Sequence, residues 1–101
     1  MRKDKGGCTY ITANKLNTVL YIGSTTELYV RTEKHRQHFY KGGFSDKYNT
    51  ERLIYYEVYD HIEEAEAREK QLKGWTRKKK EALINRLNPE WKDLFDELSP
   101  D

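Results

Sequence analysis

Two short strand-like runs near the start of the chain place the strongest constraint on its fold. Residues 8–13 and 18–22 are rich in β-branched and aromatic residues, and the segment 14–17 between them begins and ends with asparagine. This arrangement predicts an antiparallel hairpin. Tyr10 and Tyr21 would then stand on adjacent strands, and Gly23 lies two residues after Tyr21.

The remainder of the chain favours one more strand and several helices. The polar, glycine-ended residues 1–7 predict a flexible N-terminus, followed by a single α+β domain over residues 8–98. After the hairpin we expect a helix capped by Thr25 or Thr26 that runs to about Tyr40, and then a loop over 43–50. A strand over 52–59 should follow, with Ile54, Tyr56 and Val58 on one face. The last expected elements are a helix over 62–74, a helix capped by Thr76 that ends near Arg86, and a terminal helix that starts at Asn88-Pro89.

Composition excludes several classes of protein. The single cysteine, Cys8, rules out an intrachain disulfide framework and a cysteine-rich zinc site. Apolar residues make up 36% of the 101 residues, and no apolar run approaches the length of a membrane span or a signal segment. We therefore expect a cytoplasmic protein with no membrane partner.

Charge is unevenly distributed, although the net charge is only +2. Seven lysines and arginines fall between Arg68 and Lys80, whereas acidic residues dominate after Asn88. A basic cluster of this kind can neutralise nucleic-acid phosphates. A solvated helix face followed by an acidic cap explains the charge pattern equally well.

Two predicted helices carry charged or titratable residues on their inward faces. At 100° per residue, Arg31, His35 and His38 share the arc of Leu28, and Glu69 lies within the apolar stripe of the helix over 62–74. Charged groups on a core-facing surface are costly unless a partner meets them there. These positions are therefore candidates for a site that holds an anion and a cation.

The ordered set of Cys8-Thr9-Tyr10, Tyr21-Ile22-Gly23, Arg31, His35 and Glu69 resembles the GIY-YIG nuclease domain. The resemblance covers about residues 7–98 and is strongest to small stand-alone bacterial members, whose later motifs match Arg68 to Trp75 and Asn88 to Leu94. The second signature is intact, whereas Cys8 and Thr9 replace the first two residues of the first signature.

This resemblance implies a small three-stranded antiparallel sheet flanked by helices, and metal-dependent hydrolysis of DNA phosphodiesters, with a role in repair or recombination. Glu69 would be the single protein ligand of a divalent cation, Mg²⁺ or Mn²⁺, which needs few protein ligands because it keeps most of its waters. Tyr10 and Tyr21 would orient and deprotonate the attacking water, with the choice of base left open. Arg31 would hold the scissile phosphate, and His35 would assist by hydrogen bonding.

Further residues are expected around this centre, and several residues of the candidate site have an ordinary structural alternative. The candidate substrate-binding residues are Lys73, His38, Lys47 and Arg77. Tyr10 and Tyr21 could simply pack against each other across the strands. Arg31 could instead form a structural salt bridge with Glu69, and Lys73 could be the helical ion-pair partner of Glu69. The free edge of a small sheet would also allow a homodimer.

Two other functions remain open at this stage. The altered first signature and the lack of room for a target-recognition domain favour a nucleic-acid-binding module without cleavage. Alternatively, Trp75 and Trp91 suit a protein–protein adaptor, although core packing explains them as well.

Overall fold

Strand β1 (Gly7–Ala13) forms the centre of the fold in the computed structural model, which describes residues 6–38 and 41–98. It pairs antiparallel with β2 (Leu20–Thr25) on one side and with β3 (Arg52–Tyr59) on the other, which gives the strand order β2-β1-β3. The predicted α+β class with a three-stranded antiparallel sheet is confirmed. The predicted flexible segment 1–7 is described only from Gly6, and Gly7 already belongs to β1.

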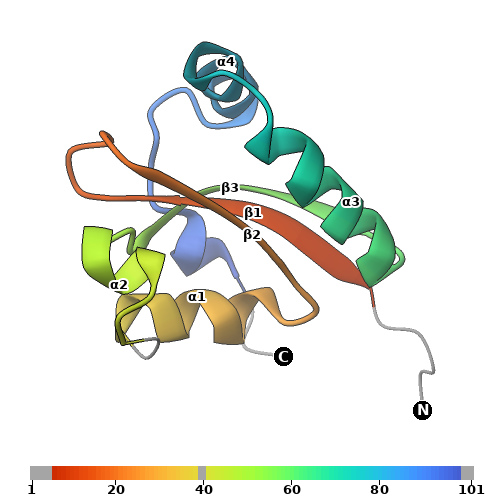
Figure 1. The fold of residues 1–101 in the computed structure, drawn as a ribbon, viewed down its shortest axis with the longest axis horizontal. Helices are drawn as coiled ribbons and strands as arrows, with labels where there is room; N and C mark the ends of the chain where they lie inside the picture. The colour runs from red at the N-terminus through yellow and green to blue at the C-terminus, as the bar shows by residue number, and fades with distance from the viewer. Residues whose placement is uncertain (1–5, 39–40, 99–101) are drawn as a thin grey trace.

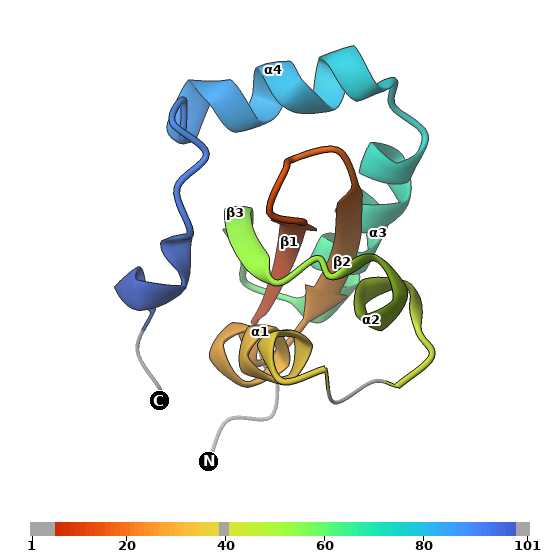
Figure 2. The same ribbon diagram turned by 90° about the vertical axis from the view of Figure 1, so that its left-hand side faces the viewer.

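Helices cover both faces of this sheet (Figure 1). Helix α3 (Ile62–Lys73) packs on one face against β1 and β2, while α1 (Leu28–Arg36) and the short α2 (Phe44–Tyr48) lie on the other side. Helix α4 (Arg77–Leu87) crosses one end of the sheet (Figure 2), and a 3₁₀ helix, η1 (Leu94–Glu97), returns to β3.

Two separate clusters of buried side chains follow from this arrangement. On the α3 face, the core contains Ile11, Ile22 and Leu72. On the α1 face, it contains Tyr10 and Leu28, with Tyr21 packed against them. Because β1 is covered on both faces, nearly all of its side chains are buried. These include Thr9, Tyr10 and Thr12, whose hydroxyl groups need hydrogen bonds.

The segment after the hairpin differs from the prediction in two respects. Strand β2 continues through Thr25, and α1 therefore begins only at Leu28, with Glu27 as its N-cap and no side-chain cap. The Thr25 hydroxyl accepts a hydrogen bond from the Glu27 N–H instead, so the threonine shapes the turn before the helix. Helix α1 ends at Arg36, and the predicted end at Tyr40 lies outside the described residues.

A second correction concerns residues 43–50, which were expected to form a loop. Residues Phe44–Tyr48 form α2, a single short helix beside the edge strand β2. Glycine, serine and aspartate favour turns in isolation, but here the Phe44 ring packs on Tyr21, with ring centroids 5.8 Å apart. Tertiary contact with β2 thus overrides the local preference.

Strand β3 contains a bulge that the alternating pattern did not reveal. Ile11 faces Tyr55 whereas Thr12 faces Leu53, so Ile54 is an extra residue in the ladder. Ile54 consequently joins the core on the α3 face, whereas Tyr56 packs on the α1 face. The prediction that both share one face is therefore wrong, and Val58 is 70% exposed.

The C-terminal helix predicted at Asn88-Pro89 is also absent from the described structure, where the only helix after α4 is η1. Asn88 is the C-cap of α4, and its side chain is buried. Its amide donates to the carbonyl oxygens of Ile54 (2.8 Å) and Lys92 (2.9 Å), and its Oδ1 accepts from the Lys92 N–H. Asn88 therefore ties the chain after α4 to the bulge in β3.

Candidate active site

Tyr10 and His35 form a buried pair between β1 and α1. The Tyr10 hydroxyl lies 3.0 Å from His35 Nε2, and the Tyr10 side chain is 0% exposed. Burial, aided by the positive charge of Arg31, lowers the pKa of His35 to about 4. The imidazole is therefore neutral at pH 7 and can exchange a hydrogen bond with the phenol.

Gly23 makes room for the Tyr10 ring. The two residues face each other across the β1–β2 ladder, and a Cβ built on Gly23 would lie 2.6 Å from the Tyr10 hydroxyl oxygen and 2.7 Å from its Cζ. No side chain fits in that space. The glycine of the Tyr21-Ile22-Gly23 motif thus allows the Tyr10 ring to cross the strand and reach His35.

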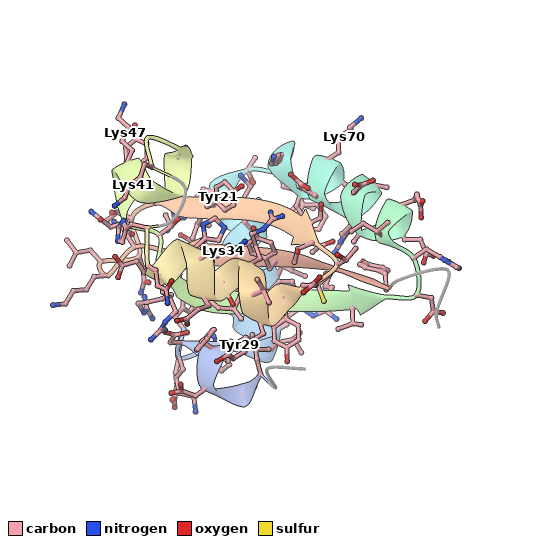
Figure 3. The ribbon with its side chains drawn as sticks, turned by 90° about the horizontal axis from the view of Figure 1, so that it is seen from below. Tyr21, Tyr29, Lys34, Lys41, Lys47 and Lys70 are labelled. Atoms are coloured by element: carbon pink, nitrogen blue, oxygen red, sulfur yellow. The ribbon has the colours of Figure 1, made fainter. Side chains whose placement is uncertain are left out.

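Of the two motif tyrosines, Tyr21 is the more accessible. Its ring packs against Tyr10 (6.2 Å between centroids), His35 (5.2 Å) and Phe44 (5.8 Å). It also lines an open cavity of about 310 Å³ at the edge of the sheet, together with Leu20, Ile22, Phe44, Lys73 and Lys80. Figure 3 shows Tyr21 on β2, with Lys41 and Lys47 at the end of the molecule where α2 lies.

Glu69 lies on the other side of the same edge strand. Its Oε1 accepts a hydrogen bond of 2.5 Å from the Ser24 hydroxyl, and its Oε2 is 2.6 Å from Lys73 Nζ. Ser24 follows Ile22 by two residues, so both point to the α3 face, whereas Tyr21 points to the α1 face. The tyrosine pair and the carboxylate therefore approach each other around β2 and do not share one face of the sheet.

The charges near Glu69 keep it ionised. Burial alone would raise its pKa, but the hydrogen bonds from Lys73 and Ser24 and the positive charges of Lys73 and Arg31 outweigh this, so the pKa of Glu69 is lowered. Arg31 thus acts electrostatically on both His35 and Glu69.

Helix α3 is held in place by contacts on both sides of Glu69. Arg68 donates two hydrogen bonds to the Glu57 carboxylate on β3, of 3.0 Å and 3.1 Å, and its guanidinium lies 5.0 Å from the Trp75 ring centre. On β1, the buried Thr9 hydroxyl donates to the Ala65 carbonyl at 2.8 Å. Thr9, one of the two residues that depart from the first signature, therefore fixes the helix that carries Glu69.

The predicted substrate-binding residues have different surroundings. Lys73 pairs with Glu69 and lines the cavity, and Lys47 lies on the exposed side of α2 with its Nζ 5.5 Å from the Tyr48 ring centre. His38 contacts the Glu51 carboxylate. Arg77 donates to the carbonyl oxygens of residues 17 and 18, which joins α4 to the hairpin turn.

Two residues of the site were missed at the sequence level. Ser24 orients Glu69, but the second strand was expected to end at Ile22, so Ser24 was assigned to a turn. Phe44 covers Tyr21, but it was placed in a loop. The motif spacing carries no signal for either residue, since both contacts depend on tertiary packing.

Comparison with known proteins identifies the family. The model of the GIY-YIG catalytic domain matches residues 6–82, which is most of the chain. The chain belongs to this family. A similar solved structure is the solution NMR structure of the UPF0213 protein BH0048 from Bacillus halodurans. It is 25% identical, the TM-score is 0.55, and the match covers 87% of this chain and 92% of that one. A search of the curated proteins gives no match.

Membership of the GIY-YIG family relates the chain to nucleases. Within residues 6–38 and 41–98, no group of three or more histidine, cysteine, aspartate or glutamate side chains could together hold a metal ion. In the same residues, no helix is long and apolar enough to cross a membrane.

Proposed function

We propose that this GIY-YIG protein is a divalent-metal-dependent endonuclease that hydrolyses phosphodiester bonds in DNA, with a role in repair or recombination. The observation that carries the proposal is the ionised Glu69, held by Ser24 at the edge strand, beside an open cavity that Tyr21 and Lys73 line. A phenol and two lysines at one cavity, with an ionised carboxylate paired to one of those lysines, are suited to binding a phosphate and activating a water.

The residues present fit a hard divalent cation. An ionised carboxylate accepts about four hydrogen bonds or metal contacts, and Ser24 and Lys73 occupy one on each oxygen of Glu69. Mg²⁺ binds through one or two carboxylates and keeps several waters. A Mg²⁺ or Mn²⁺ ion held by Glu69 would polarise the phosphate and stabilise the leaving oxygen. The Lys73 ammonium competes for the same carboxylate, which predicts modest metal affinity.

The burial of the two tyrosines supports different roles for them. Tyr21 is half-buried and lines the cavity, so its hydroxyl is the one suited to contact the attacking water. Tyr10 has no exposed surface and bonds to His35, so it is suited to positioning Tyr21 through ring packing. In this scheme Tyr21 orients the water, and the neutral His35 fixes the phenol pair.

Arg31 and Lys73 would act on the phosphate. The Arg31 charge influences both halves of the site, as expected of a group that offsets negative charge between them. Lys73 reaches the cavity from α3 while pairing with Glu69. Fixed positive charge at a reacting phosphate is a large source of rate enhancement because it needs no reorganisation during the reaction.

The first test is cleavage by wild-type protein and by Glu69→Gln. We expect cleavage of DNA only with Mg²⁺ or Mn²⁺, and at least about a hundredfold loss in Glu69→Gln, the scale of losing one preorganised catalytic group. Glu66→Gln is the matched control, since Glu66 is exposed on the same helix. Circular dichroism should show both variants folded. Full activity of Glu69→Gln would refute the assignment of this carboxylate.

A nucleic-acid-binding module without cleavage is the alternative. It is favoured by the direct neutralisation of Glu69 by Lys73 and by the structural use of Thr9 in the first signature. This alternative predicts DNA binding whose affinity falls steeply with salt, and no cleavage with either cation. Product formation that depends on Glu69 would exclude it.

A further inference from the structure

Two aromatic rings on α2 are exposed beside the candidate site. Phe44 is 47% exposed and Tyr48 is 40% exposed. Their ring centroids lie 4.7 Å apart, and Phe44 in turn contacts Tyr21 at 5.8 Å. Tyr21, Phe44 and Tyr48 therefore form a continuous row that leads from the site to the surface, which we call the aromatic row.

Ordinary core packing does not account for this row. The other large apolar side chains that the described residues expose, Leu16, Val30, Val58 and Leu87, are scattered over the hairpin turn, α1, β3 and α4. Single exposed apolar residues of this kind are normal on a protein surface. Adjacent exposed rings are different, because together they present a contiguous aromatic patch, and such patches mark binding surfaces.

Positive charge lies at both ends of the row. At the outer end, Lys47 Nζ is 5.5 Å from the Tyr48 ring centre. At the inner end, Lys73 and Lys80 line the cavity that Tyr21 and Phe44 share, and the described residues lining it include no acidic side chain. Figure 3 shows Lys41 close to Lys47 at the outer end, where α2 lies. An apolar peptide would satisfy the rings but not these cations.

We propose that the aromatic row binds unpaired nucleotides of single-stranded DNA, stacking a base on Phe44 while Lys47, Lys73 and Lys80 contact the flanking phosphates. Stacked rings beside a cationic groove are the usual means of holding single strands, and the bases of a duplex keep their faces covered. This inference rests on the proposed function, since it specifies which DNA substrate reaches Tyr21. The row would guide a strand end, gap or flap toward the cavity.

The test uses an oligonucleotide that contains 2-aminopurine, whose fluorescence is quenched when the base stacks on an aromatic ring. Wild-type protein in EDTA should quench the single strand and bind it at least about tenfold more tightly than the same sequence as a blunt duplex. Phe44→Leu keeps an apolar cover but removes the flat face. We expect at least about fivefold weaker binding, the factor equivalent to ~1 kcal/mol of stacking, and loss of the quench.

Val58→Ala is the matched control, because Val58 is exposed and apolar but lies on β3. Tyr48→Leu provides a second variant in case Phe44→Leu does not fold. Unquenched fluorescence, equal affinity for the duplex, or an equal loss in Val58→Ala would overturn the inference. A quench with RNA alone would overturn the choice of DNA.

The outcome is separable from that of the proposed function, because binding in EDTA requires no cleavage. Stacking on Phe44 without metal-dependent cleavage would refute the endonuclease and leave the single-strand site standing. Cleavage that depends on Glu69, with no loss of binding in Phe44→Leu, would do the reverse.

Discussion

Replacing Gly23 by alanine tests the most constrained contact of the site. The added Cβ would lie 2.6 Å and 2.7 Å from the hydroxyl oxygen and Cζ of Tyr10, both closer than a Cβ approaches other atoms in folded proteins. The Tyr10 side chain is 0% exposed and bonds to His35, so its ring has little space in which to retreat. Either the strand or the ring must shift.

We expect the loss of folding free energy in Gly23→Ala to resemble that of overpacking a core. Such insertions destabilise by roughly 1–3 kcal/mol. Removing a glycine from a strand would by itself stabilise by about 0.5–1 kcal/mol, so a net loss has to come from the overlap. We expect Gly23→Ala to lower the free energy of unfolding by about 2 kcal/mol in urea denaturation, and Tm by roughly 8–16 °C for a domain of this size.

The matched control is Gly74→Ala at the end of α3. A Cβ there would meet only the Gln71 carbonyl oxygen, at an ordinary 3.5 Å, and the backbone has a φ of −85° that alanine accepts. We expect this variant to be as stable as wild type or slightly more stable. If Gly23→Ala matched Gly74→Ala in stability, the Tyr10 ring could not be pressed against β2 as described.

The remaining predictions concern pH and the loop after α4. Burial lowers the pKa of His35 to about 4, so below pH 6.5 the unfolded chain binds a proton that the folded protein does not. The free energy of unfolding should therefore fall by about 2 kcal/mol between pH 7 and pH 5. Urea titrations of wild type and His35→Asn check this, since the stability of the variant should depend less on pH. Asn88→Ala removes the donor to the buried Ile54 carbonyl and should cost about 1–3 kcal/mol by the same measurement, whereas an unchanged midpoint would show that Asn88 does not brace the bulge.

The sequence predicted the sheet and the two main helices of the site well, because their signals are local. Alternation and turn residues define the hairpin, and the Thr76 cap is present where it was expected, with its hydroxyl accepting from the Lys79 N–H. The family resemblance is confirmed as well. The roles of Tyr10, Tyr21, Arg31, His35 and Glu69 remain predictions, now with defined surroundings.

The features that escaped prediction depend on contacts between distant segments. The extra residue Ile54 reverses the side-chain alternation in β3, and its carbonyl accepts a hydrogen bond from Asn88, which is 34 residues away. Ser24 becomes a partner of Glu69 only because β2 continues past Gly23 against α3. Propensity describes each segment by itself and cannot indicate such pairings.

The central position of β1 has a consequence for when this site can exist during synthesis. Strand β1 precedes the elements that complete its surroundings. Strand β3 pairs with one of its edges, and α3, which accepts the Thr9 hydrogen bond 56 residues later, covers one of its faces. Tyr10 gains its hydrogen-bond partner only when His35 has been added to the chain, and Ser24 gains its partner only with Glu69, 45 residues later. Long-range closures of this kind are slow to form, because the entropy of loop closure must be lost before the contacts are gained. A nascent or truncated chain that ends before α3 therefore lacks Glu69 and the helix that carries it, and the candidate site cannot be assembled from such a chain.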